Sequence, residues 1–211
     1  MIARLARHAL EQLVRAALIE DAPWGDLTSE ALIPAAAIFD AQLVAREDGV
    51  LCGEDIFSLA MQLTDDSVET TFGVHDGERF ADGQILATVR GPARAVLQAE
   101  RVALNFVQRL SGVATLTAKY VAETAGTNCR IADTRKTTPG LRLVERYAVR
   151  CGGGKNHRYS LSDAVMAKDN HLAVLAASGS GNLTDSLREV RQRLPHTAHL
   201  EVEVDSPDQI D

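Results

Sequence analysis

A short stretch of the chain gathers many basic side chains. Between Arg130 and His171 the sequence holds nine basic residues and four acidic ones, a local balance of +5 in a chain whose net charge is −7. Arginine binds carboxylates and phosphates through paired hydrogen bonds, and lysine binds them as a point charge. Positive charge focused in an acidic protein indicates an anionic ligand. The alternative is a solvated basic face, where most charge runs lie.

The positions of these basic residues along the chain favour a ligand-binding site over a solvated basic face. Strand-like segments at 130–133, 164–167 and 199–204 alternate with helical patterns at 141–150 and 183–194. This order indicates parallel strands joined by right-handed crossovers, and functional side chains gather at the C-terminal ends of such strands. All three segments end in charged residues, which are Arg135 and Lys136, then Lys168, then Glu203 and Asp205. We therefore expect one site at this rim.

The acidic residues of the last segment suggest a metal. Glu201, Glu203 and Asp205 alternate with valines, which places all three carboxylates on one face of a strand. Mg²⁺ binds few protein oxygens together with substrate phosphates. The alternative is a set of structural ion pairs, which is the better account of Glu201.

Two other polar residues have two interpretations each. Arg101 lies beside the apolar stripe of a predicted helix over 94–108, so it needs either an anionic ligand or a salt bridge to Glu100 or another acid. His157 is either an acid or base, or a hydrogen-bond donor to an anion. The glycines at 152–154 follow a helix and lack the frame of a phosphate-binding loop.

The first hundred residues carry no comparable chemistry. An amphipathic helix over 4–20 precedes strand-like segments at 39–53, 70–74 and 84–90 and a short helix over 56–63. After the helix over 94–108 we expect a second helix over 114–125. The chain therefore divides into an N-terminal mixed α/β sandwich domain, 1–110, and a parallel α/β domain, 111–211.

The composition excludes several classes of protein. The acidic net charge argues against general nucleic-acid binding, and no apolar run approaches the length of a membrane span. The cysteines, Cys52, Cys129 and Cys151, are odd in number and form no CxxC pair, which favours reduced thiols in the cytoplasm. Cys151 is either a small packed side chain, which we favour, or a reactive thiolate beside cations.

Several motifs resemble those of quinolinate phosphoribosyltransferases. They are DTRKTTPGLR at 133–142, YAVR at 147–150, GGG at 152–154, NHR at 156–158 and KDNH at 168–171, with GDLTS at 25–29 and LSGVAT at 110–115 upstream. That family converts quinolinate and phosphoribosyl pyrophosphate to nicotinate mononucleotide, CO₂ and pyrophosphate with Mg²⁺, in NAD biosynthesis. The resemblance covers essentially the whole chain.

The resemblance implies roles for individual residues. The substrate-binding residues would be Arg101, Thr134, Arg135, Lys136, His157, Arg158 and Lys168. The catalytic residues would be Lys136, Lys168 and Glu203, and Glu203 would also bind the metal.

The resemblance also implies a fold and partners. The second domain would be a TIM-like parallel α/β barrel, incomplete here because family members continue past residue 211, so we expect a truncated record of a longer protein. The family assembles as a homodimer in which Arg101 acts across the interface. Two alternatives stay open, namely a related phosphoribosyltransferase-like protein of molybdenum-transport loci and a non-catalytic anion- or nucleotide-binding fragment.

Overall fold

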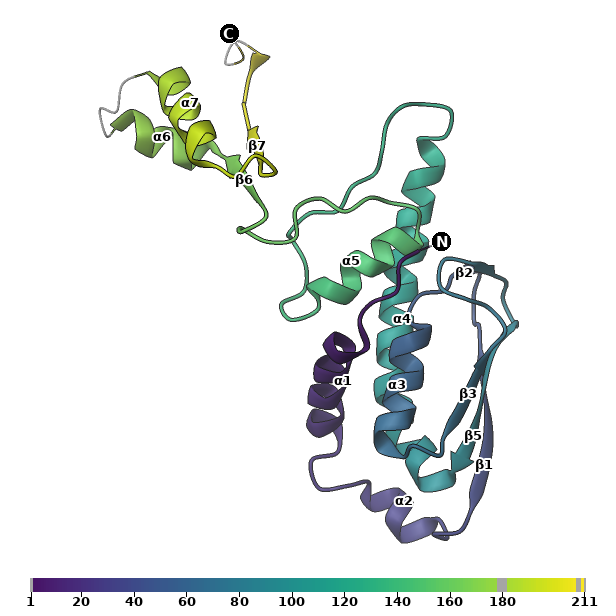
Figure 1. Ribbon diagram of the computed structural model, residues 1–211. Helices are drawn as coiled ribbons and strands as arrows, with labels where there is room; N and C mark the ends of the chain where they lie inside the picture. Colours follow the sequence, from purple (N-terminus) through teal and green to yellow (C-terminus); the bar gives the residue numbers. More distant parts are fainter. Residues whose placement is uncertain (1, 178–181, 208–209, 211) are drawn as a thin grey trace. The chain divides into compact units, whose positions relative to one another are not determined.

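The computed structural model describes residues 2–177, 182–207 and 210 of the chain. It divides the chain into two compact units, Met1–Asn156 and His157–Asp211, each described here by itself. Figure 1 shows a sheet with helices in the first unit and a pair of strands with two helices in the second. The domain boundary expected after residue 110 stays a prediction.

An antiparallel sheet forms one layer of the first unit. Its strands are β1 (Ile38–Val44), β5 (Ile85–Pro92) and β3 (Glu69–Phe72), in the order β1-β5-β3. Ala41 lies opposite Val89, and alternate side chains of β5 are buried, as the period of two requires. A smaller ribbon pairs β2 (Gly49–Val50) with β4 (Arg79–Phe80).

Helices cover one face of this sheet. They are α3 (Glu54–Thr64) and α4 (Ala93–Glu123), with α1 (Arg7–Asp21) on their outer side and the short α2 (Leu27–Leu32) between α1 and the sheet in sequence (Figure 1). Leu51, Ile56 and Leu110 are among the fully buried side chains between the layers. The expected mixed α/β sandwich is confirmed.

The prediction of two helices over 94–108 and 114–125 was wrong, because α4 runs unbroken from Ala93 to Glu123. Ser111 and Gly112, read as a break, lie in its interior. A glycine costs about 1 kcal/mol there. The burial of Leu110 and Ala114 outweighs that cost, and the Ser111 hydroxyl bonds the backbone of Cys52, with Oγ accepting from N at 3.1 Å.

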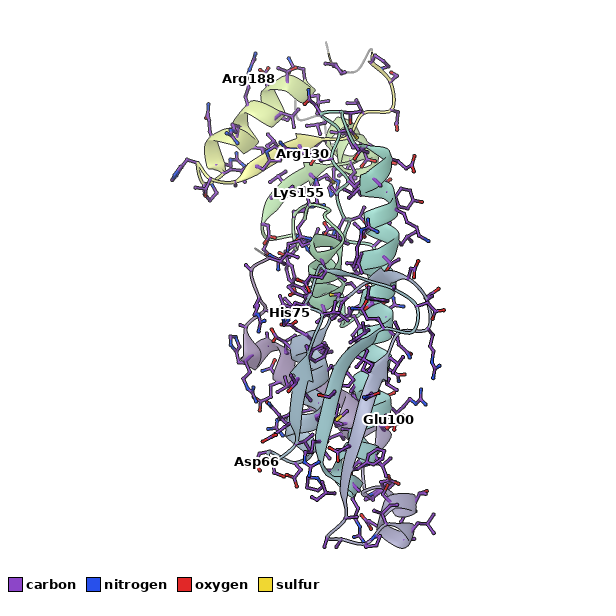
Figure 2. The ribbon with its side chains drawn as sticks, turned by 90° about the vertical axis from the view of Figure 1, so that its right-hand side faces the viewer. Asp66, His75, Glu100, Arg130, Lys155 and Arg188 are labelled. Carbon is purple, nitrogen blue, oxygen red and sulfur yellow. The ribbon has the colours of Figure 1, made fainter. Side chains whose placement is uncertain are left out.

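The expected strand over 130–133 is also wrong. Within the described ranges this segment forms an isolated parallel bridge between Ala132 and Lys155 (Lys155 is labelled in Figure 2). The amide of Lys155 donates to Ile131 O at 2.8 Å, and the amide of Asp133 donates to Lys155 O at 3.0 Å. The bridge leads into the loop 133–138 and then into α5 (Arg142–Cys151).

The second unit contains the predicted parallel pair. β6 (Ala164–Ala167) and β7 (His199–Val202) run in parallel, with Ala164 opposite His199, and α6 (Asp169–Ala177) and α7 (Leu183–Arg193) lie between them in sequence. The side chain of His171 turns back to accept a hydrogen bond from the amide of Lys168 at 3.1 Å, which agrees with a structural role for this histidine.

Some apolar side chains of the first unit face solvent. Trp24 is 91% exposed between α1 and α2, and Leu27, Leu32 and Ile38 are exposed on the neighbouring segments. In the part of the chain that the structure describes, no helix combines the length and the apolar character that crossing a bilayer requires.

Candidate active site

The loop 133–138 carries three predicted site residues, Thr134, Arg135 and Lys136. Side chains from α5 hold this loop. Arg142 Nε donates to Thr137 Oγ1 at 3.2 Å, and the amide of Lys136 donates to Thr134 Oγ1 at 3.1 Å. The loop is therefore shaped by contacts within the first unit.

A buried carboxylate fixes the end of the loop. Glu145 accepts hydrogen bonds from Arg109 Nε at 2.9 Å and from the amide of Thr138 at 3.1 Å, while Arg109 Nη2 donates to Thr138 Oγ1 at 2.6 Å. Burial alone would raise the pKa of Glu145, but the hydrogen bonds from Thr138 and Arg109 and the charge of Arg109 outweigh it and lower that pKa. Sequence reasoning missed Arg109 and Glu145, although an acid inside the basic stretch was a signal.

A second buried pair fixes the start of the loop. Arg146 Nε lies 3.2 Å from Asp133 Oδ2, and both side chains are buried. Asn156 Nδ2 joins them by donating to Asp133 Oδ2 at 2.6 Å and to Arg146 O at 2.9 Å. Arg146, one of the nine basic residues of the stretch, is thus committed to the fold.

Arg135 differs from these paired residues. Its Nε is buried and has no hydrogen-bond partner within the described ranges. A buried donor without an acceptor costs about 1–3 kcal/mol, so such a group calls for a ligand or another explanation. Thr134 and Lys136 on either side of it are exposed.

Arg101 lies on α4 and is exposed. The alternative of a salt bridge to Glu100 or another acid is not observed among residues 2–177, 182–207 and 210. Its neighbours Val102 and Ala103 are buried, so the backbone of this turn is fixed while the guanidinium projects into solvent.

In the second unit, two predicted residues meet at adjacent strand ends. Lys168 follows β6 and Glu203 follows β7, and Lys168 Nζ lies 2.7 Å from Glu203 Oε2. Both side chains are about half exposed, at 45% and 56%. Parallel pairing of β6 and β7 explains this meeting, since their C-terminal ends share one edge.

His157 and Arg158 lie on the segment that leads into β6. His157 Nε2 lies 3.2 Å from Glu201 Oε2, and Arg158 Nη1 donates to Ala164 O at 3.0 Å. The pairing of Glu201 agrees with the structural role expected for it.

The site residues thus fall into two groups. The first unit places Thr134, Arg135 and Lys136 on one held loop and Arg101 on α4. The second unit joins Lys168 to Glu203 and holds His157 and Arg158 beside β6. The roles assigned to these residues stay predictions.

A pocket of about 480 Å³ lies elsewhere in the first unit, between the β1–β2 segment and α4. Phe80, Ser111 and Thr115 are among its lining residues. None of the predicted site residues lines it.

Family models match both halves of the chain. The model of the quinolinate phosphoribosyl transferase N-terminal domain matches residues 26–111, and that of the C-terminal domain matches residues 113–211. The chain belongs to the quinolinate phosphoribosyltransferase family. The two-domain α/β fold expected from the sequence is that of the family.

Curated relatives support this membership of the quinolinate phosphoribosyltransferase family. A probable nicotinate-nucleotide pyrophosphorylase (carboxylating) of Bacillus subtilis is 39% identical over 201 residues, which are 95% of this chain and 68% of the relative. The nicotinate-nucleotide pyrophosphorylase (carboxylating) of Mycobacterium leprae is 43% identical over 206 residues, covering 96% of this chain and 70% of the relative.

Solved structures agree. NadC from Streptococcus pyogenes matches with a TM-score of 0.90 at 39% identity, over 97% of this chain and 70% of that one. The nicotinate-nucleotide pyrophosphorylase from Francisella tularensis matches with a TM-score of 0.90 at 34% identity, over 100% of this chain and 72% of that one.

Proposed function

We propose that this quinolinate phosphoribosyltransferase transfers the phosphoribosyl group of phosphoribosyl pyrophosphate to quinolinate with loss of CO₂. The products are nicotinate mononucleotide and pyrophosphate. Family membership and the names of the relatives support this activity. In the structure, the observation that carries it is the buried Nε of Arg135, which lacks an acceptor among the described residues. A ligand carboxylate supplies what that donor lacks.

Quinolinate binding rests on the held loop. Arg135 offers a planar fork to one carboxylate of quinolinate, and Lys136 beside it adds a point charge. Because Arg142 and Glu145 hold the loop just after Lys136, at Thr137 and Thr138, little ordering is needed when the acid binds.

In this proposal, Lys168 and Glu203 bind the phosphoribosyl donor, phosphoribosyl pyrophosphate, and its metal ion. Mg²⁺ takes few protein carboxylates and several substrate oxygens, and a half-exposed carboxylate at a strand end fits that donor set. When a polyphosphate binds, Lys168 exchanges Glu203 for a phosphate oxygen, and the carboxylate becomes available as a ligand. The ion would neutralise charge on the departing pyrophosphate.

The reaction follows from these charges. The pyridine nitrogen of quinolinate bonds to the anomeric carbon as the bond to pyrophosphate breaks, and Lys168 stabilises the leaving charge. The bond to the carboxylate beside the ring nitrogen then breaks. Its electron pair stays on the ring carbon next to the cationic nitrogen and takes up a proton as CO₂ leaves.

Arg101 points to a shared site in a homodimer. It is exposed and has no ion pair in the described part of its own chain, as an arginine that serves a second copy would be. We also propose a cytoplasmic location. The three free cysteines support it, because thiols stay reduced in that compartment.

The activity is tested by mixing the protein with quinolinate, phosphoribosyl pyrophosphate and Mg²⁺ and measuring nicotinate mononucleotide and CO₂. We expect both products, and we expect Arg135→Ala to lose them. The control is Arg90→Ala, which removes an exposed arginine paired with Asp40 on the sheet. Failure to bind quinolinate would contradict the proposed function. Binding without turnover would show that the protein recognises quinolinate but does not catalyse the transfer.

Shared sites are tested by mixing two inactive variants. If Arg101 acts in the partner's site, mixed dimers of Arg101→Ala and Arg135→Ala contain one site with neither change. We expect activity to return on mixing, toward about a quarter of wild type at random assortment. Sedimentation gives the oligomeric state. A dimer without any recovery would place Arg101 in its own subunit's site.

A further inference from the structure

A buried cluster of sulfur and oxygen donors lies in the first unit, apart from the predicted substrate residues. Its members are Cys52, Asp76 and Cys151, whose ligand atoms all lie within 4.8 Å of one another. Cys52 precedes α3, Asp76 lies in the turn beside His75 (labelled in Figure 2), and Cys151 ends α5. Three distant segments of the chain thus converge on one point.

The carboxylate of this cluster is held in place. Asp76 Oδ1 accepts from the amides of Gly53 at 2.7 Å and Glu54 at 3.1 Å, so it caps the N-terminus of α3. Asp76 Oδ2 accepts from the hydroxyl of Tyr147 at 2.8 Å. Tyr147 and Cys151 are four residues apart on α5, which places their side chains on one helix face.

The two cysteines and the tyrosine that bonds Asp76 are shielded from water. Cys52 is 0% exposed, Cys151 is 5% exposed and Tyr147 is 6% exposed. A bound cation would stabilise the thiolate forms of the two cysteines directly.

We propose that Cys52, Cys151 and Asp76, with the Tyr147 hydroxyl as the fourth donor, bind a thiophilic divalent cation of the zinc class. Two sulfurs and a carboxylate are donors that zinc takes in its tetrahedral sites, and Mg²⁺ and Ca²⁺ do not take sulfur. On binding, the ion displaces the two thiol protons, which leave to solvent. The ion then faces two thiolates and one carboxylate, with the N-terminus of α3 nearby.

Such an ion would tie the start of α3 to the end of α5. The glycine turn at 152–154 follows Cys151 directly and leads to Asn156, which bonds Asp133 and Arg146. The site is structural in kind, since a closed set of protein donors leaves no position for substrate. It does not depend on the proposed transferase activity.

Cobalt titration of the full chain under a non-thiol reductant tests this site. Co²⁺ bound by thiolates gives sulfur-to-cobalt charge-transfer absorption in the near ultraviolet. We expect this absorption to saturate at one ion per chain and to disappear when Zn²⁺ is added. Cys129→Ser is the matched control, because Cys129 is exposed and lies outside the cluster, and it should keep the signal.

The variants then assign the ligands. Cys52→Ser and Cys151→Ser should each lose the charge-transfer band, whereas Tyr147→Phe should keep it with lower affinity, because it removes the neutral oxygen donor and leaves both sulfurs. Wild type alone gives a second measurement that needs no variant to fold, since Zn²⁺ should raise its thermal midpoint. No band in wild type, or a band that survives loss of either buried cysteine, overturns the proposal, as does a midpoint that Zn²⁺ leaves unchanged.

Discussion

Arg135 and Glu145 differ in whether their buried polar atoms have hydrogen-bond partners. Glu145 is buried and its oxygens accept from Arg109 and Thr138, whereas the Nε of Arg135 has no acceptor in the described part of the chain. The basic surplus visible in the sequence includes both Arg135 and the paired Arg146. It could not separate Arg135 from Arg146, because the acid that neutralises Arg146 is brought to it by the fold.

The first prediction concerns Arg135. Replacing Arg135 by alanine should weaken quinolinate binding by about 2–5 kcal/mol, because the ligand carboxylate loses a desolvated charged partner. Arg135→Lys should recover part of this loss, since it restores charge without the planar fork. Isothermal titration with quinolinate measures both. An unchanged dissociation constant in Arg135→Ala would remove this residue from the site.

The second prediction concerns Glu145. Glu145→Gln should lower the free energy of unfolding by about 1 kcal/mol at neutral pH, because hydrogen bonds to a charged acceptor are stronger than those to an amide. The half-exposed Arg109 keeps the effect small. Denaturant titrations of wild type and variant at a series of pH values give the difference.

The pH dependence of that difference has a definite sign. The pKa of Glu145 is lowered from its ordinary 4.5 in the folded protein, so the ionised form contributes stability that is complete above 4.5. The contribution is lost as pH falls through the lowered folded pKa. The gap between wild type and Glu145→Gln should therefore close in acid, and a gap that stays constant would contradict the assignment.

At the scale of elements, α4 shows what local pattern cannot supply. Ser-Gly reads as a helix end when each residue is judged by propensity, yet packing of Val107, Leu110 and Ala114 carries the helix through it. The same limit explains the lost strand over 130–133, since a strand needs a partner and, in the part of the chain that the structure describes, this segment forms one isolated bridge, with Lys155. The parallel pairing of β6 and β7 was predictable because alternation of elements restricts topology.

The third prediction compares two glycines. Gly112 lies in the interior of α4, and a Cβ there would meet no atom within 4 Å, so Gly112→Ala should stabilise the protein by about 0.5–1 kcal/mol. Gly152→Ala is the matched opposite, because its Cβ would meet the carbonyl oxygen of Ala114 and lie 2.6 Å from Thr117 Cβ. It should destabilise by about 1–3 kcal/mol. Thermal unfolding of both variants checks the contrast, and equal shifts would contradict it.

At the scale of the whole molecule, the two units differ in their cores. The first unit buries a continuous apolar cluster between sheet and helices. Among the described residues of the second unit, Ala167 alone is a buried apolar residue, and α7 has none buried. The sequence indicated two α/β parts, but it did not indicate this difference in burial, which depends on how the elements pack.

The fourth prediction follows from that difference. Backbone amides of α7 and β7 should exchange with deuterium faster than those of α3 and α4, because local opening costs less where few apolar side chains are buried. Hydrogen-exchange mass spectrometry of the intact chain measures both sets of peptides. Equal protection of α7 and α4 would show that burial within each unit does not govern opening.

Trp24 gives the protein a built-in optical reporter. It is the single tryptophan of the sequence and is 91% exposed, so its emission should lie at long wavelength while the chain is folded and alone. Denaturation should therefore change the emission wavelength of Trp24 little. A shift toward the blue would instead mark the moment when another surface, such as a second subunit, covers this corner of the chain.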